Sequence, residues 1–123
     1  MIWENNGAVA LWLMNADNTK NTQFTFGPIP GWSAVDVSAG VDNSTRLLWV
    51  NPIGQALVWS ISDTGVSTQG PVFGPFAGWN ATRLSSGEDG YTRLLWTSNN
   101  GAQDLWILNA DNTQFNSTAF GPF

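Results

Sequence analysis

The chain has 123 residues, enough for one domain with a hydrophobic core and too few for two ordinary domains. It contains no cysteine and no histidine, which excludes disulfides, a thiol nucleophile, a Ser-His-Asp triad and the usual zinc ligands. The net charge is −5 and only 4 residues are Lys or Arg, so neither nucleic acid nor a membrane is an expected partner. We therefore expect a protein that is not an enzyme and needs no metal or cofactor.

An internal repeat of 47 residues is the strongest signal in the sequence. Phe-Gly-Pro begins at Phe26, Phe73 and Phe120, and Arg-Leu-Leu-Trp begins at Arg46 and Arg93. Seven of the 8 tryptophans keep the same register, and the eighth joins it if one residue is deleted from the following turn. A fixed interval of this size indicates a repeat architecture.

The repeat divides the chain into a partial copy at 1–31, a complete copy at 32–78 and a third copy at 79–123. The first copy begins within the second strand of the repeat and so holds three strands. In the second copy, runs rich in Val, Leu, Ile, Trp and Thr predict strands at about 32–40, 45–51, 55–62 and 67–74. Asn, Asp, Gly and Pro fill the joins, as hairpin turns require. The 13 Gly and 6 Pro, and the lack of a 3.6-residue apolar stripe, disfavour helix.

Two strands of the second copy are predicted to be apolar on both faces. Leu47, Leu48 and Trp49 are consecutive, and so are the apolar residues at 57–59. Because a sheet with one wet face would alternate, each sheet should pack between two others. We therefore predict an all-β fold, a β-propeller with blades of about 47 residues and four antiparallel strands each. The small residues of 32–40 suit the innermost strand. A closed solenoid and a β-trefoil, which needs three complete copies, are the alternatives.

The three copies amount to about two and three-quarter blades, whereas propellers have about four to eight. One chain cannot close such a ring, and an open ring would expose apolar blade faces. Two interpretations follow. The chain associates with itself head to tail until the ring closes, or it is a natural or engineered fragment of a longer repeat protein.

The order of motifs also carries a family resemblance. The third copy reads Gly-Trp, a small-residue strand, Arg-Leu-Leu-Trp, Leu-Trp, Asn-Ala-Asp and then Phe-Gly-Pro, and the other two copies keep parts of this series. This pattern resembles the Trp-rich repeats of bacterial β-propeller proteins and is loosely similar to tectonin-like and fucose-binding propeller lectins. The resemblance covers essentially the whole chain. It implies a propeller, and it suggests carbohydrate binding because several such lectins are short chains that oligomerise into a ring.

Two tryptophans are candidates for a sugar-binding site. Trp32 and Trp79 follow a Gly-Pro-rich junction, whereas the other tryptophans of the register lie within strands and should be core: Trp12, Trp49, Trp59, Trp96 and Trp106. In the predicted topology, the junction shares its end of the sheet with the turn between the second and third strands. An indole could therefore stack on a pyranose while turn amides bind its hydroxyls. The candidate amides are Asn51 and Gln55 beside Trp32, and Asn99 and Gln103 beside Trp79.

The opposite end of the predicted sheets carries a second group of candidates. Asp42 and Arg46 bracket one hairpin tip, Asp89 and Arg93 bracket the next, and Tyr91 lies beside the second pair. The equal spacing predicts a surface ion pair across each hairpin, with a ligand-binding face as the alternative.

The Asn-Ala-Asp-Asn-Thr segments at 15–19 and 109–113 carry oxygen ligands that Ca²⁺ could use. They lack the Asp-x-Asp-x-Asp-Gly loop and its distal Glu, so we predict hairpin turns there. Taken together, the sequence predicts a lectin-like carbohydrate-binding module whose partners are further copies of itself and glycans. The alternative is a structural or interaction scaffold without a small ligand.

Overall fold

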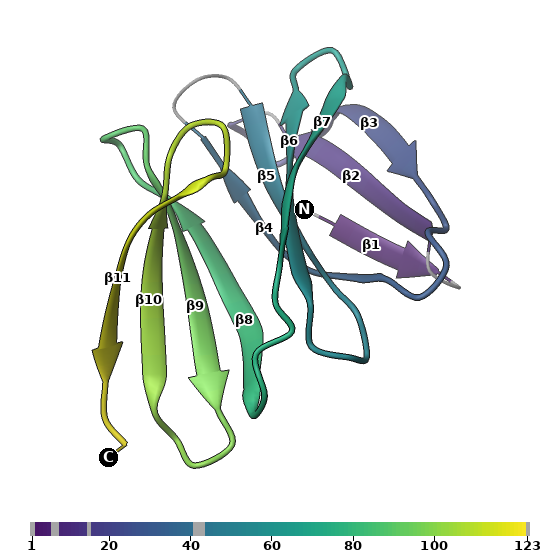
Figure 1. Ribbon diagram of the computed structural model, residues 1–123. Coiled ribbons are helices and arrows are strands. Elements are labelled where there is room, and N and C mark those ends of the chain that lie inside the picture. The colour runs from purple at the N-terminus through teal and green to yellow at the C-terminus, as the bar shows by residue number, and fades with distance from the viewer. Residues whose placement is uncertain (1, 6–7, 15, 41–43, 123) are drawn as a thin grey trace.

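The computed structural model describes residues 2–5, 8–14, 16–40 and 44–122. Over these ranges the chain is all-β, with eleven strands in three antiparallel sheets (Figure 1). The described residues contain no helix, and hence none of the length and apolar character that spanning a membrane requires.

Each sheet corresponds to one copy of the repeat, with its strands paired in the order of the sequence. The first sheet contains β1 (Ile2–Asn5), β2 (Ala8–Met14) and β3 (Lys20–Phe26). The second contains β4 (Ser33–Ala39), β5 (Ser44–Val50), β6 (Ala56–Ser62) and β7 (Ser67–Phe73). The third contains β8 (Trp79–Ser86), β9 (Thr92–Ser98), β10 (Gln103–Leu108) and β11 (Gln114–Phe120). The four strands predicted for the second copy match β4–β7 to within one residue at either end, and the all-β prediction is confirmed.

The second sheet is buried on both faces, as its consecutive apolar residues predict. Leu48 and Val58 pack against the third sheet, in one core cluster with Trp96. Leu47 and Trp49 point the other way and pack against the first sheet. Figure 1 shows the resulting arrangement, in which three twisted sheets stand face to face. The hydrophobic core therefore consists of two separate layers, one on each side of the second sheet.

The first strands of the second and third sheets, β4 and β8, lie side by side. The Asp36 carboxylate accepts a hydrogen bond from the Leu84 amide at 2.8 Å, and the Ser38 hydroxyl accepts one from the Ser86 amide at 2.8 Å. These bonds occupy amides at the edge of β8 that would otherwise be unpaired, and so they fix how the two sheets meet.

Two of the tryptophans expected in the core are only half-buried. Trp12 lies on the outer face of the first sheet, where no other described sheet covers it, so its place between two blades stays a prediction. Its ring contacts Trp3, with centroids 5.7 Å apart, and the Lys20 ammonium lies 4.9 Å from its centroid. Trp59 contacts Trp49 of its own sheet and Phe26 of the first sheet. Its ring therefore packs only in the core layer between the first and second sheets.

Candidate functional site

A groove of about 340 Å³ lies where the β7–β8 link meets the β9–β10 turn. Its lining residues are Ala77, Gly78 and Trp79 from the link and Ser98, Asn99, Asn100 and Ala102 from the turn. The Asn99 amide donates to the Gly78 carbonyl at 2.9 Å, which ties the two segments together. Gly78 has a φ of 82°, a left-handed conformation that favours glycine at this position. The local backbone therefore places the Trp79 indole beside the turn.

Two asparagines in the groove differ in what their side chains do. Asn100 is part of the turn itself: its side-chain oxygen accepts from the Ser98 hydroxyl and, at 3.2 Å, from the Ala102 amide. The Asn99 side chain is exposed and makes no hydrogen bond to any other described residue. Asn99 thus offers both a donor and an acceptor to a ligand that lies against Trp79.

The structure brings together part of the predicted site in the third copy. Trp79 and Asn99 share the groove, and Trp79 is half-buried because it also packs against the core between the second and third sheets. Gln103 does not line the groove. It lies at the start of β10, paired in register with Thr97 and Phe120.

The candidate residues of the second copy are arranged differently, and in the 47-residue register Asn51 and Gln55 correspond to Ser98 and Ala102 rather than to Asn99 and Gln103. The Asn51 side chain donates to the Gln55 side-chain oxygen at 2.8 Å and accepts from the Gln55 amide at 2.9 Å. These amides line a cleft of about 50 Å³ with Asn80 of the third sheet, and Trp32 is not part of its wall. Trp32 instead packs, half-buried, against the core between the first and second sheets. The turn amides here bind one another, which leaves little for a ligand.

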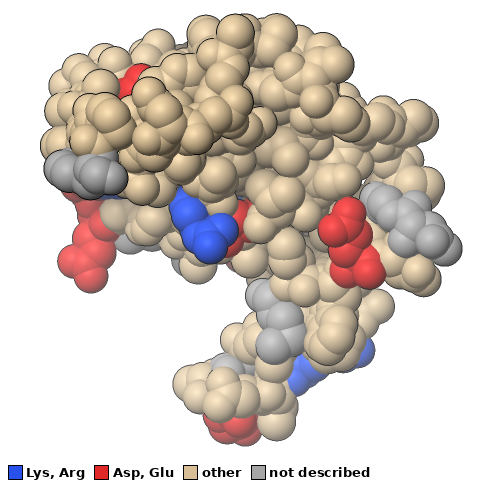
Figure 2. Space-filling model, turned by 90° about the horizontal axis from the view of Figure 1, so that it is seen from below, with Lys and Arg blue, Asp and Glu red and all other residues tan. Residues whose placement is uncertain are grey.

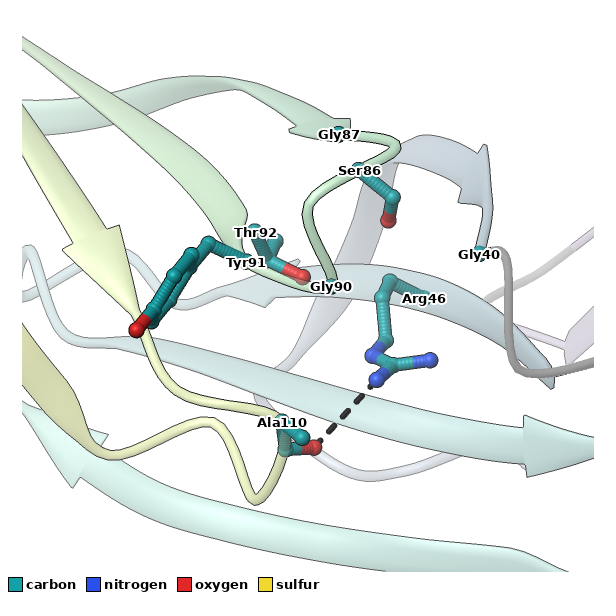
Figure 3. A pocket seen from close by; sticks show the side chains of 8 residues that line it. All are labelled: Gly40, Arg46, Ser86, Gly87, Gly90, Tyr91, Thr92 and Ala110. Atoms are coloured by element: carbon teal, nitrogen blue, oxygen red, sulfur yellow. Dashed lines mark hydrogen bonds between the residues drawn. The ribbon is translucent and has the colours of Figure 1, made fainter.

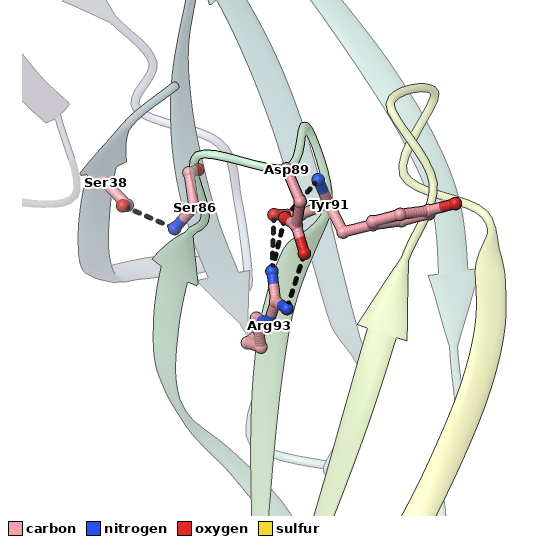
Figure 4. A network of polar contacts seen from close by, with 5 residues as sticks. All are labelled: Ser38, Ser86, Asp89, Tyr91 and Arg93. Atoms are coloured by element: carbon pink, nitrogen blue, oxygen red, sulfur yellow. Dashed lines mark hydrogen bonds and ion pairs between the residues drawn. The ribbon is translucent and has the colours of Figure 1, made fainter. Parts of the chain in front are cut away.

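At the opposite end of the third sheet, Asp89 and Arg93 form the ion pair that the sequence predicts (Figure 4). The contact is bidentate, with Arg93 Nη1 at 2.7 Å from Asp89 Oδ1 and Nη2 at 2.8 Å from Oδ2. The Tyr91 amide donates to the same carboxylate at 3.1 Å, while the Tyr91 ring turns away to contact Phe115. Asp89 and Arg93 therefore satisfy each other, and Tyr91 packs on β11.

This pair should give Asp89 a distinctive titration. Its hydrogen bonds from Arg93, above all, and from the Tyr91 amide lower the pKa of Asp89 from 3.8 to about 2. Because the pKa is lower in the folded state, the stabilisation is complete above pH about 4 and disappears as pH falls towards about 2. We expect Arg93→Gln to return the pKa of Asp89 towards its ordinary value, measured by the carboxyl carbon shift in an NMR titration. An unchanged low pKa in that variant would contradict the role of the pair.

Arg46, the equivalent of Arg93, lies in a different environment from the surface position that the sequence predicts. It is 2% exposed, because the β10–β11 turn of the third sheet covers it. Its guanidinium donates to the Ser44 hydroxyl and, at 3.2 Å, to the Ala110 carbonyl (Figure 3). Asp42, the partner predicted for Arg46, lies outside the described residues. Arg46 thus joins the second sheet to the third, beside a cavity of about 80 Å³.

The turn that covers Arg46 is held by its own side chains. The Asp111 carboxylate accepts from the Thr113 amide at 3.1 Å and from the Thr113 hydroxyl at 2.6 Å, and these bonds lower the pKa of Asp111. Asn112 has a φ of 67° and is buried, and its side-chain Nδ2 donates to the Ser60 hydroxyl at 2.8 Å. The prediction of a hairpin turn at 109–113 is confirmed, and the turn fastens the third sheet to the second.

Charged side chains are few and scattered on the face seen in Figure 2, which views the molecule from the lower end of Figure 1. That end carries the β9–β10 turn and hence the Trp79 groove. A ligand held in this groove would be recognised through an aromatic ring and amides rather than through ionic contacts.

No protein-family model and no curated protein matches the chain. Among solved structures, it is similar to a protein of unknown function from Bacteroides caccae, with a TM-score of 0.60 and 14% sequence identity. The similarity covers 94% of this chain but 38% of that protein, so this chain spans less than half the length of the solved structure. At this level of identity the similarity concerns the all-β fold alone.

Proposed function

We propose that this chain is a lectin-like carbohydrate-binding module without catalytic activity, and that sugars bind in the Trp79 groove. The observation that carries the proposal is the half-buried Trp79 indole next to the exposed Asn99 amide in one shallow groove. An indole face stacks on the apolar C–H patch of a pyranose, and an amide both donates to and accepts from its hydroxyls. Such a site needs no charged residue, which agrees with its uncharged lining.

We further propose that the three sheets are β-propeller blades and that several copies associate into a closed, multivalent ring. The support comes from a pair of tryptophan rings that recurs in every sheet. In the second sheet the pair is Trp49 and Trp59, with centroids 5.1 Å apart, and in the third sheet the corresponding centroids are 5.2 Å apart. Each of these pairs packs against the preceding sheet. In the first sheet the pair is Trp3 and Trp12, which lies on the outer face, and Trp3 is 55% exposed.

In a ring, the exposed Trp3–Trp12 pair of one copy would pack on the outer face of the third sheet of the next copy. Leu95 and Leu105, directly opposite each other on β9 and β10, occupy the repeat positions of Leu48 and Val58. Those two residues of the second sheet are the ones that receive the tryptophans of the third sheet. The outer face of the first sheet is therefore complementary to the outer face of the third sheet. A head-to-tail contact between two copies would repeat the packing seen between sheets within one chain.

We propose no catalysis because most carboxylates near the candidate faces are already engaged, and Asp104, which has one unpartnered oxygen, has no second free carboxylate beside it in its cavity. Asp89 pairs with Arg93, Asp111 binds Thr113 within its turn, and Asp36 accepts the amide of Leu84. A retaining glycosidase needs two carboxyl groups about 5–5.5 Å apart and free to act on the substrate. The described carboxylates offer no such pair at the Trp79 groove.

A glycan array followed by titration calorimetry tests the carbohydrate proposal. We expect Asn99→Ala to weaken binding of the best array ligand several-fold, and Trp79→Ala to weaken it by about tenfold or more, because stacking supplies the larger contact. Arg93→Ala, at the opposite end of the same sheet, is the matched control and should leave the affinity nearly unchanged.

Trp79→Ala could weaken binding by loosening the core, because Trp79 packs against it. Asn99 is exposed, so Asn99→Ala tests the groove without this effect. Loss of binding in Arg93→Ala while Asn99→Ala and Trp79→Ala bind normally would move the site to the Asp89–Arg93 end.

The second candidate function is a scaffold that assembles but binds no small ligand. It is favoured by the hydrogen bonds between Asn51 and Gln55, because a lectin with repeated sites would leave these amides available in each copy. An unaltered chain that binds no glycan on the array yet associates in solution would support the scaffold.

A further inference from the structure

A cavity of about 250 Å³ lies beside Trp79 at the edge of the core between the second and third sheets and is built almost entirely from aromatic rings. Its lining residues are Phe76, Trp79, Trp96, Asp104 and Trp106. Three of these rings contact one another: the centroid of Phe76 lies 5.3 Å from Trp96 and 5.6 Å from Trp106, both nearly edge-on. The rings thus hold one another in place and form a rigid aromatic box.

One carboxylate is set into the wall of this box. Trp106 Nε1 donates to Asp104 Oδ2 at 3.2 Å, which fixes the side chain. The other oxygen, Oδ1, is buried and has no hydrogen-bond partner among the described residues. A buried carboxylate oxygen without a partner costs free energy, and a cation close by would offset that cost. None of the chain's 4 Lys and Arg residues lines the cavity.

The repeat shows that the carboxylate is a local departure rather than part of the fold. The residue equivalent to Asp104 in the second copy is Leu57, which is 5% exposed in the core beside Trp49 and Trp59. The tryptophan pairs in the two copies have nearly the same separation, 5.1 and 5.2 Å. The equivalent tryptophan pair therefore lies beside Leu57 in the second sheet and beside the Asp104 carboxylate, at the cavity, in the third.

We propose that this aromatic box binds a small quaternary or methylated ammonium cation. The faces of indole rings are electron-rich and attract a cation, and the Asp104 carboxylate adds a negative charge to the same space. Methyl groups match the apolar walls, and a quaternary ammonium needs no hydrogen bond, so the buried Oδ1 can act through its charge alone. A pyranose would lose most of the hydrogen bonds of its hydroxyls here, so this cavity differs in specificity from the Trp79–Asn99 groove. The two proposed sites share Trp79, but Asp104 lines this cavity alone, so the two proposals can fail separately.

Titration of the unaltered chain with choline, followed by tryptophan fluorescence and calorimetry, tests the proposal. We expect saturable binding at millimolar concentration or below. The neutral isostere 3,3-dimethylbutan-1-ol has the same shape without the charge, and it should bind about tenfold more weakly or worse. Asp104→Asn keeps the shape of the side chain but removes its charge, and it should weaken choline binding by a similar factor. Asp111→Asn, an exposed site in the same sheet, is the control and should bind choline like the unaltered chain.

Asp104→Leu provides a second variant, because leucine already occupies this position in a folded copy of the repeat. It should keep the fold, as seen by circular dichroism, and abolish choline binding. The proposal is overturned if choline does not bind the unaltered chain, if the neutral isostere binds equally well, or if Asp104→Asn binds choline normally. If choline did not bind and a glycoside did, with its binding lost in Asp104→Leu, the cavity would be a sugar site instead.

Discussion

Replacing Trp49 with alanine should lower the free energy of unfolding by about 3–5 kcal/mol, the range for removing a large buried aromatic side chain. Trp49 is fully buried in the core layer between the first and second sheets, in contact with the Trp59 ring. Its removal would leave a cavity that two sheets would have to close. Because a small domain has a total stability of about 5–15 kcal/mol, this loss should lower the midpoint of urea or thermal denaturation strongly.

Ile53→Ala is the matched control, since Ile53 is 67% exposed in the turn between β5 and β6. Its free energy of unfolding should stay within about 0.5 kcal/mol of the unaltered chain. If Trp49→Ala and Ile53→Ala melted alike, the second sheet could not be packed against the first as described.

Much of this fold is predictable from the sequence because the repeat interval locks the strands into register. Leu47, Leu48 and Trp49 are consecutive apolar residues, and a strand can bury all of them only if both faces of its sheet are covered. The structure confirms this, with Leu48 in one core layer and Trp49 in the other. The Asp89–Arg93 pair is predictable for a similar reason, because its spacing places both residues across one hairpin.

What the sequence does not predict depends on contacts between sheets. Arg46 and Arg93 have the same local sequence, but only Arg46 is covered by the turn of a following sheet. The hydrogen bonds between Asn51 and Gln55 depend on the particular turn, Asn-Pro-Ile-Gly-Gln, which differs from the turn after β9. Asp104 could have been found from the sequence, because it stands in register with a leucine.

A charge on the open face of the third sheet should prevent the association of copies. Leu105→Glu would place a carboxylate in the middle of the outer face of the third sheet, where we propose that the Trp3–Trp12 pair of another copy packs. Burying an unpaired carboxylate is costly, so the variant should dissociate into single chains. Sedimentation velocity would show a smaller species with unchanged circular dichroism. Ile53→Glu, which adds the same charge to an exposed turn, should assemble like the unaltered chain. Equal assembly by both variants would contradict the proposed contact.

The mass of the unaltered chain in solution tests the central claim, that the outer faces complete one another in a closed assembly. The largest exposed apolar patch of a soluble monomer is usually about 300–600 Å², and two open sheet faces that carry Trp3, Trp12 and Leu105 favour association. Native mass spectrometry with light scattering at micromolar concentration should therefore give a single species that contains two or more chains of 13.3 kDa each. A uniform species of 13.3 kDa under the same conditions would contradict the account.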